Sequence, residues 1–228
     1  MNPLDTLNEE IIHCRKCLRL VEWREEVARV KRKAYQNEEY WGKPVPGFGD
    51  PHARILVVGL APGAHGSNRT GRQFTGDASG NFLFPALYRA GFANQPEAES
   101  RSDGMILKDM YITASGRCAP PDNKPSPAEL NACQPYLERE LQILQPKVIV
   151  CLGKIAFDRI LKILGARGLK FAHGATYRLE PSTFNLQPLT LLCSYHPSQQ
   201  NTLTGKLTEE MFDKIWKKAG ELTQGSVV

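Results

Sequence analysis

The sequence of 228 residues lacks any long hydrophobic run. Its first fifty residues contain no apolar stretch long enough to span a bilayer, and residues 1–10 lack the basic-then-apolar order of a secretory signal. Internal repeats and low-complexity tracts are absent as well, which argues against a repeat architecture. These absences predict a soluble, intracellular protein that acts in the cytoplasm and binds no membrane.

A strong excess of one charge sign is also missing. The net charge is +5, which by itself does not indicate a polyanionic partner. Basic residues do gather near the amino end, where they could contact phosphates with a salt-sensitive affinity; they are Arg15, Lys16, Arg19, Arg24, Arg29, Lys31, Arg32 and Lys33. From charge alone, a solvated helix face is the better interpretation of this group.

Cysteine, in contrast, is well represented. The chain has six cysteines, and a reducing compartment makes them poor candidates for disulfides. Cys14 and Cys17 are separated by two residues, a spacing that favours metal or cluster ligation. Cys151 and Cys193 lie inside apolar stretches, and we interpret them as small buried core residues.

Four short apolar runs alternate with stretches of helical periodicity. The runs predict buried strands at residues 54–59, 110–113, 147–152 and 189–194. Helices are predicted at residues 81–90, 127–144 and 154–164, with a charged helical segment at 7–33 and a closing helix at 209–222. The alternation predicts one α/β domain over residues 1–228: a three-layer α/β/α fold around a mostly parallel, four-stranded sheet, with ligands beyond the carboxyl ends of its strands.

A glycine-rich loop follows the first predicted strand. Residues 59–66 read Gly-Leu-Ala-Pro-Gly-Ala-His-Gly, and the glycines allow a tight turn and a close approach of backbone to ligand. This spacing suits an ordinary strand-to-helix turn equally well, and it lacks the Gly-x-Gly-x-x-Gly order of dinucleotide-binding loops. Its continuation places Phe74 and Asp77 three residues apart in a long polar loop, residues 63–81, and loops of that length in a compact domain are usually functional.

A second candidate loop follows the last predicted strand. Residues 193–201 read Cys-Ser-Tyr-His-Pro-Ser-Gln-Gln-Asn, so His196 emerges where an α/β sheet presents residues to ligands. A single histidine beside a proline is more often structural than catalytic. Together with the glycine-rich loop, however, it completes a set of an aromatic ring, a carboxylate and an imidazole.

These two loops resemble the first and last motifs of the uracil-DNA glycosylase superfamily. Within it they look like the iron-sulfur-containing family 5, or type-b, enzymes, and the resemblance runs from Cys14 to about Leu207. Other branches carry Asp or Asn in the first motif to handle water, whereas this sequence has Ala61 there, as the type-b branch does.

The resemblance implies a monofunctional DNA-repair glycosylase. Such an enzyme hydrolyses the N-glycosidic bond of uracil and other deaminated bases, such as hypoxanthine, in double-stranded DNA, and leaves an abasic site. No lysine stands poised as a Schiff-base nucleophile, which agrees with base removal without strand cleavage. The family analogy also implies a monomer.

The resemblance further implies a cofactor. Cys14, Cys17, Cys118 and Cys133 stand where the type-b family places the ligands of a structural 4Fe-4S cluster, so the N-terminal helical segment would contribute two of the four. The same four thiolates would suit a tetrahedral zinc site, and the family resemblance alone decides for iron.

The resemblance assigns each candidate residue a task in base removal. Phe74 would stack on a base flipped out of the duplex, and Asn123 would read the polar edge of a pyrimidine. Ala61 and Gly63 would add backbone contacts. His196 would hydrogen-bond the base oxygen that gains negative charge, and Asp77 would stabilise the sugar cation or orient the attacking water.

Plain structural alternatives exist for these residues. Phe74 could be a core residue, Asn123 could form a turn beside its prolines, and Asp77 could cap the following helix. Either Gln200 or Leu203 could be the wedge that enters the base stack. For the whole protein, the alternatives are a non-catalytic iron-sulfur nucleic-acid binder or redox sensor with the same fold, and a zinc-stabilised hydrolase of small nucleosides.

Overall fold

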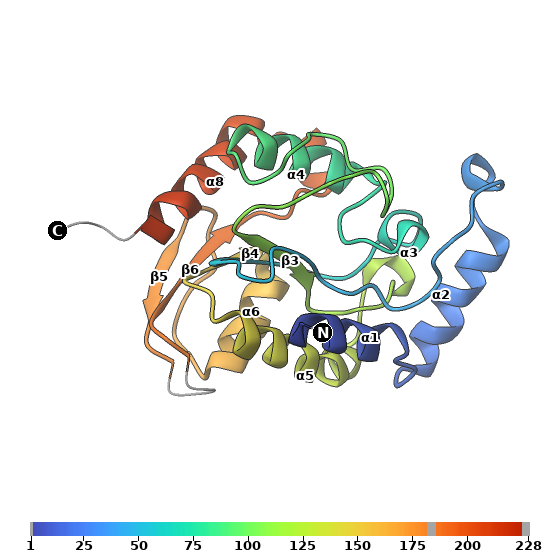
Figure 1. The fold of residues 1–228 in the computed structure, drawn as a ribbon, viewed down its shortest axis with the longest axis horizontal. Helices are drawn as coiled ribbons and strands as arrows, with labels where there is room; N and C mark the ends of the chain where they lie inside the picture. Colours follow the sequence, from blue (N-terminus) through green and yellow to red (C-terminus); the bar gives the residue numbers. More distant parts are fainter. Residues whose placement is uncertain (1, 182–185, 225–228) are drawn as a thin grey trace.

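The computed structural model describes residues 2–181 and 186–224, and it has a six-stranded sheet between two layers of helices (Figure 1). The strand order is β1-β3-β2-β4-β6-β5. The four predicted strands are present as β2 (Ile55–Gly59), β3 (Met110–Ala114), β4 (Val148–Leu152) and β6 (Leu189–Ser194). Neighbouring strands of this set pair in parallel, so the predicted α/β/α fold is confirmed.

The sheet has six strands rather than the predicted four. The additional ones are the edge strands β1 (Phe48–Gly49) and β5 (Thr176–Leu179), which pair antiparallel with β3 and β6. Neither carries a continuous apolar run: β1 has only two residues, and β5 reads Thr-Tyr-Arg-Leu and is half-buried. Edge strands are less enclosed than central ones, so their sequences need not be continuously apolar.

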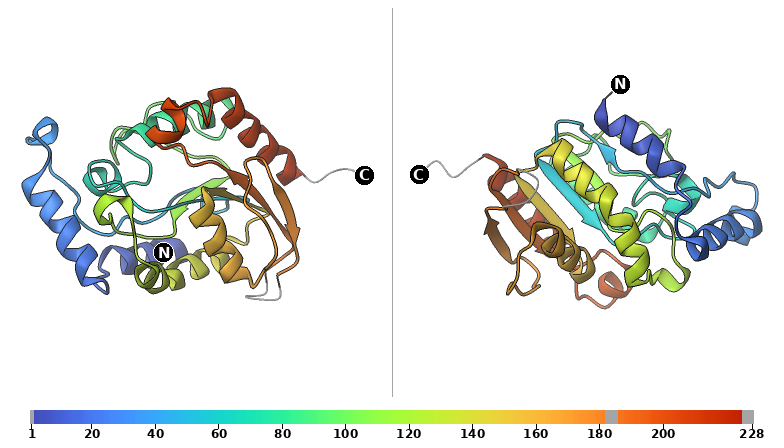
Figure 2. Two further views of the ribbon diagram at one scale, coloured as in Figure 1. Left: turned by 180° about the vertical axis from the view of Figure 1, so that it is seen from behind. Right: turned by 90° about the horizontal axis from the view of Figure 1, so that it is seen from below.

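Helices cover both faces of the sheet (Figures 1 and 2). On one face, α4 (Ala78–Arg89) packs against α8 (Glu209–Gln224), and on the other lie α1 (Pro3–Ile12), α5 (Pro127–Leu144) and α6 (Lys154–Leu164). Side chains of the central strands alternate between the two layers: Val57 packs with α4 and α8, and Val58 with α5 and α6. Each face of the sheet therefore has its own hydrophobic core.

Local sequence explains where several helices begin and end. At the start of α5 the Glu129 backbone N–H donates to Ser126 Oγ at 3.2 Å, and the Ser126 N–H donates to Glu129 Oε2 at 2.7 Å, which forms a capping box. Gly165 ends α6 with a left-handed φ of 68°. Helix α4 begins at Ala78, earlier than the predicted residue 81, because Asp77 caps it.

The predicted N-terminal helical segment is two helices instead of one. Helix α1 is followed by a break that contains Cys14 and Cys17, and α2 (Leu18–Val30) then lies at one end of the molecule (Figure 1). Short helical turns occupy other connections: η1 (Lys33–Tyr35), α3 (Ser67–Thr70), η2 (Pro121–Asn123) and α7 (Gln199–Leu203). Within the described ranges, no helix combines the length and apolar character needed to cross a membrane.

Candidate active site

A cavity of about 930 Å³ opens at the carboxyl ends of the central strands. Its wall is built from the loops that follow β2, β3 and β6, and from the segment that follows α2. The six residues that the sequence predicted to bind or act on substrate all line this cavity: Ala61, Gly63, Phe74, Asp77, Asn123 and His196. They meet because parallel strands end at the same edge of a sheet.

Asp77 uses its two carboxylate oxygens in different ways. Oδ1 accepts the backbone N–H of Gly80 at 3.0 Å and so caps α4. Oδ2 lies against the glycine-rich turn, where a Cβ added to Gly66 would fall 2.1 Å from it and one added to Gly63 would fall 3.1 Å from it. The helix-cap alternative is therefore correct, and the same carboxyl group also lines the cavity.

Opposing electrostatic effects act on Asp77. Burial raises the pKa of the Asp77 carboxyl, the N–H groups of Gly80 and Ser79 and the charge of Arg69 lower it, and the net shift is upward. Arg69 is held nearby because its Nη2 donates to the Gly76 carbonyl at 2.9 Å. A carboxyl group with a raised pKa in a cavity is a common mark of a functional site.

Phe74 has a backbone conformation that is unusual for an aromatic residue. Its φ of 53° lies in the left-handed region, which costs a non-glycine residue on the order of 1 kcal/mol. The ring packs over Gly59, where an added Cβ would lie 2.8 Å from Phe74 Cζ, and its centroid is 5.8 Å from that of His196. Phe74 is 7% exposed and belongs to the hydrophobic core, as the alternative held, while also lining the cavity.

His196 lies in the loop after β6, with its ring inclined by 31° to that of Phe74. Burial lowers the pKa of His196 to about 4, so the imidazole is neutral near pH 7 and has one N–H to donate. The side-chain amide of Asn201 donates to the His196 carbonyl at 2.8 Å and holds the loop. His196 can therefore act as a neutral hydrogen-bond donor in the cavity.

Asn123 lies in the loop after β3, within the short turn η2. Asp122 and Asn123 both have left-handed backbones, with φ values of 53° and 56°, and Asp and Asn tolerate this conformation better than most residues. The turn-forming alternative is thus correct, and the turn brings Asn123 to the cavity.

The cavity wall also contains residues that the two sequence motifs did not predict to bind or act on substrate. The segment after α2 contributes Arg32 and Tyr35, and the glycine-rich loop contributes His65. The Tyr40 hydroxyl lies 3.1 Å from His65 Nδ1, and burial together with the charges of Arg32 and Arg69 lowers the pKa of His65. The motif itself points to His65, whereas nothing in the sequence links residues 32–40 to the loop after β2.

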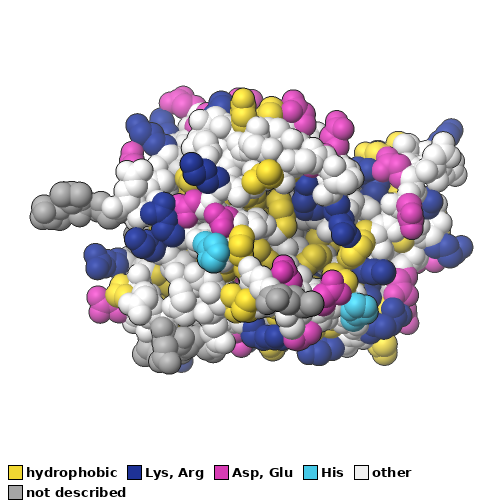
Figure 3. All heavy atoms as spheres, in the orientation of Figure 1, with side chains coloured by type: hydrophobic (Ala, Val, Ile, Leu, Met, Phe, Trp, Pro, Cys, Tyr) yellow, Lys and Arg dark blue, Asp and Glu magenta, His cyan; other side chains and the backbone are white. Residues whose placement is uncertain are grey.

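Surface charges are mixed in sign. Figure 3 shows Lys and Arg side chains interspersed with acidic ones on the viewed face, in keeping with the net charge of +5. Three exposed members of the N-terminal basic group form ion pairs: Arg15 with Glu25, Arg19 with Glu129, and Arg29 with Glu26. Arg19 and Arg29 lie on α2 and fit the interpretation as a solvated helix face. Arg15 lies in the break before α2, Arg24 is buried and Arg32 lines the cavity.

The four cysteines predicted as ligands come from three segments: Cys14 and Cys17 from the break between α1 and α2, Cys118 from the loop after β3, and Cys133 from α5. Burial raises the pKa of Cys17, and the neighbouring thiols Cys133 and Cys14 raise it further. Burial likewise raises the pKa of Cys118 to about 12. Within the part of the chain that the structure describes, no three Cys, His, Asp or Glu side chains form a set that could hold a metal ion.

A hydrogen-bond donor points at the sulfur atom of Cys118. Buried Arg24 donates from Nη1 to Cys118 Sγ at 2.9 Å and to the Cys14 carbonyl at 3.3 Å. Such donors stabilise thiolates. The two other cysteines are fully buried in β4 and β6, as predicted for Cys151 and Cys193.

Comparison with known proteins supports the resemblance of the two motifs. The profile of the "Uracil DNA glycosylase superfamily" matches residues 46–220. A "Type-5 uracil-DNA glycosylase" of Thermus thermophilus is 53% identical over 212 residues, covering 92% of this chain and 93% of the relative. Its counterpart of the same name in Mycobacterium leprae is 48% identical over 221 residues, covering 95% and 94%.

A more distant relative belongs to another type. The "Type-4 uracil-DNA glycosylase" of Archaeoglobus fulgidus is 31% identical over 225 residues, covering 97% of this chain and 94% of the relative. Identity to the two type-5 relatives is clearly higher. The chain therefore belongs to the uracil-DNA glycosylase superfamily and, within it, to the type-5 family.

Proposed function

We propose that this protein removes uracil and other deaminated bases, such as hypoxanthine, from double-stranded DNA, acting as a monomer and leaving an abasic site. The observation that carries the proposal is the convergence of Phe74, Asp77 and His196 on one cavity. The type-5 relatives named as uracil-DNA glycosylases cover more than nine-tenths of the chain. Family membership supplies the reaction class, and the cavity supplies groups suited to it.

Binding requires that the target nucleotide leave the duplex. A cavity of about 930 Å³ is large enough for a flipped base. Phe74 would stack on that base, a contact worth roughly 1–3 kcal/mol, and Asn123 would bond its polar edge as donor and acceptor. Ala61 presents only a methyl group, so this position of the first motif adds no polar side-chain contact that would select uracil alone. This supports a breadth that includes hypoxanthine.

Departure of the base leaves negative charge on the base and positive charge on the sugar. His196 would donate its N–H to the base oxygen that becomes negative. Asp77 would use Oδ2, the oxygen that does not accept the Gly80 N–H, to stabilise the sugar cation or orient the attacking water. Neither residue forms a covalent bond to the sugar, so the product is an abasic site in an intact strand.

Leu203 is the better candidate for the wedge that replaces the flipped base in the stack. It ends α7 with 83% of its surface exposed, whereas Gln200 is one of the residues that line the cavity. Minor-groove wedges are usually apolar, which also favours Leu203.

The chemistry of the four-cysteine set supports a structural 4Fe-4S cluster, because thiolates are the ligands that such clusters take. Cys14, Cys17, Cys118 and Cys133 would be its ligands, and Arg24 supplies a donor to sulfur of the kind that surrounds thiolate-bound clusters. When bound, the cluster supplies a link between the break after α1, the loop after β3 and helix α5. Zinc on the same thiolates would supply a similar link.

Incubation of the purified protein with a uracil-containing duplex, followed by alkali, tests the function. Strand breaks that appear only after alkali are expected, because alkali cleaves abasic sites. A hypoxanthine-containing duplex tests the breadth of base removal in the same way. No breaks at any enzyme concentration would exclude the proposal and favour the non-catalytic binder or redox sensor. Action on free deoxyuridine alone would favour the nucleoside hydrolase.

Absorbance tests the cofactor separately. A brown protein with a band at about 400 nm is expected for an iron-sulfur cluster. A colourless protein that contains one zinc ion per chain would instead assign the same thiolates to zinc.

A further inference from the structure

The residues on both sides of Phe74 form hydrogen bonds with other parts of the fold. The Gln73 side-chain amide donates to the Val45 carbonyl at 3.1 Å. The Gly76 N–H donates to the Ala98 carbonyl at 3.0 Å. Phe74 lies between these two hydrogen-bonded residues and has a left-handed φ of 53°. This conformation persists only when surrounding contacts impose it.

The Arg72 side chain forms hydrogen bonds both within this segment and with a second loop. Its Nε donates to Thr75 Oγ1 at 2.8 Å, while Nη1 and Nη2 donate to the two Asp103 carboxylate oxygens at 2.7 and 2.6 Å. Arg72 is 6% exposed and Thr75 is fully buried. The guanidinium therefore connects the residue after Phe74 to Asp103 by bonds that are largely shielded from water.

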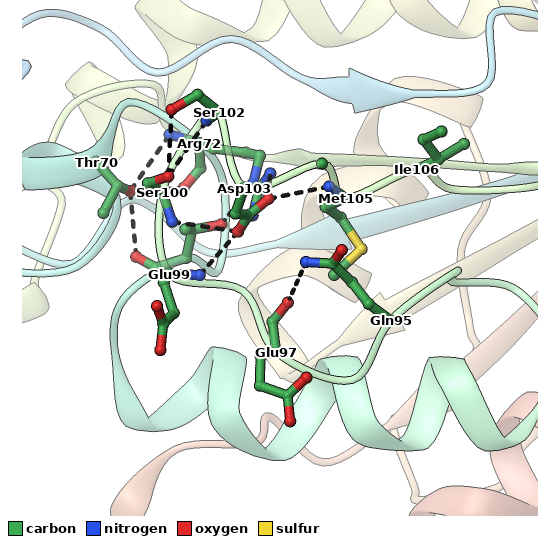
Figure 4. A network of polar contacts seen from close by, with 12 residues as sticks. Thr70, Arg72, Gln95, Glu97, Glu99, Ser100, Ser102, Asp103, Met105 and Ile106 are labelled. Atoms are coloured by element: carbon green, nitrogen blue, oxygen red, sulfur yellow. Dashed lines mark hydrogen bonds and ion pairs between the residues drawn. The ribbon is translucent and has the colours of Figure 1, made fainter.

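Asp103 belongs to a separate loop, residues 94–107, and organises it (Figure 4). Its carboxylate accepts the backbone N–H groups of Glu99 at 2.9 Å, Ser100 at 3.2 Å and Met105 at 3.0 Å. Burial acts to raise the pKa of Asp103, but Arg72 and these N–H groups lower it to about 2. The carboxylate is thus ionised near neutral pH, which favours its pairing with the Arg72 guanidinium.

Among the described residues, neither Arg72 nor Thr75 lines the cavity, and no residue of the 94–107 loop does. Their side chains consequently have no direct contact with a base in the cavity. Any influence on base removal must pass through the segment that they hold, which carries Phe74.

We propose that Arg72 and Asp103 are positioning residues that hold Phe74 in the conformation needed to stack on the flipped base. The inference rests on the stacking role proposed above for Phe74. Without the ion pair, the segment relaxes toward an ordinary backbone and the ring leaves its place over Gly59 and beside His196. Base removal then slows, whereas affinity for undamaged duplex, which does not fill the cavity, stays the same.

A double-mutant cycle tests this coupling with the full-length protein. Single-turnover rates of uracil release from a duplex are measured for the wild type, Asp103→Asn, Phe74→Leu and the double variant. We expect Asp103→Asn to slow release about tenfold in the wild-type background and to have no further effect in the Phe74→Leu background. The same factor in both backgrounds would overturn the inference, because Asp103 would then act independently of Phe74.

The cycle also separates this inference from the proposed function. A wild-type protein that releases no uracil contradicts the function itself. A Phe74→Leu variant that releases uracil at the wild-type rate removes the stacking role, and the inference with it, but leaves the function in place.

Asp109→Asn is the control for loss of an arginine–carboxylate ion pair that lies away from the cavity. Both carboxylate oxygens of Asp109 accept from the guanidinium of Arg54, and Oδ1 also accepts the Arg54 backbone N–H at 2.9 Å. It precedes β3, at the end of the sheet opposite the cavity. We expect Asp109→Asn to keep the wild-type rate; a tenfold loss here as well would show a general effect of removing such pairs and contradict the inference.

Thr75 provides a second test that leaves the ion pair intact. Thr75→Val removes the hydroxyl that accepts from Arg72 Nε, and Thr75→Ser keeps it. Slow release by the valine variant and recovery by the serine variant are expected, at temperatures well below the melting temperature of each protein. A valine variant with the wild-type rate would overturn the proposal even if Asp103→Asn failed to fold.

Discussion

At the residue scale, Asp77 combines a structural and a chemical task in one carboxyl group. Oδ1 caps α4 and Oδ2 lies at the glycine-rich turn. Asparagine caps helices about as well as aspartate but cannot carry the negative charge. We therefore expect Asp77→Asn to lower the rate of uracil release by about 100-fold, with DNA binding and the melting temperature nearly unchanged. Single-turnover assays and thermal unfolding measure the two effects, and an unchanged rate would leave helix capping as the only role.

His196 should make stability depend on pH. Its ordinary pKa of 6.5 falls to about 4 in the folded protein, so between these values the unfolded chain binds a proton that the folded chain does not. The contribution of His196 to stability is complete above pH 6.5 and is lost as the pH falls toward 4. His196→Gln should therefore flatten the rise of melting temperature with pH across this window. A rise as steep as that of the wild type would contradict the shifted pKa.

At the element scale, the turn after β2 and the start of α4 fit together only because glycine leaves room. A Cβ on Gly66 would lie 2.1 Å from Asp77 Oδ2 and 2.7 Å from Asp77 Cβ, so Gly66→Ala must displace either the turn or the carboxylate. A displacement of about 1 Å at a reacting group can cost about 100-fold in rate, and we expect a loss of that order in single-turnover uracil release.

Gly116→Ala is the control for this prediction. A Cβ at Gly116 would make an ordinary contact at 3.5 Å with the Cβ of Ala61, so activity should remain near the wild-type value. Equal rates for the Gly66 and Gly116 variants would show that the turn adjusts freely around Asp77.

At the scale of the whole molecule, the four cysteines Cys14, Cys17, Cys118 and Cys133 come from three separate segments of the chain. Helix α2 carries Arg24, which contacts Cys118, and the segment that follows α2 brings Arg32 to the cavity. A cofactor on these thiols would therefore stabilise one wall of the site. We expect Cys17→Ser to lose the band at about 400 nm, to melt at a lower temperature and to release uracil more slowly.

The matched control is Cys151→Ala, which removes a fully buried cysteine from strand β4 rather than from the proposed set. This variant should keep the absorbance band. Loss of the band in both variants, or in neither, would contradict the assignment of Cys17 as a ligand.

The sequence by itself determined the central strands, helix α5 and the family. Each central strand is buried on both faces and therefore reads as a continuous apolar run, and the capping box at Ser126 and Glu129 is a purely local signal. The two motifs that carry the family resemblance follow β2 and β6, so their residues were expected at the same edge of the sheet.

Only the tertiary structure decided three features: the presence of the edge strands, the contribution of Arg32 and Tyr35 to the cavity, and the ion pair between Arg72 and Asp103. It also showed that Phe74 is at once a core residue and a cavity residue. The physical reason is the same in each case. These features depend on contacts between residues that are distant in the chain, and such contacts impose no periodicity, spacing or capping pattern on the local sequence.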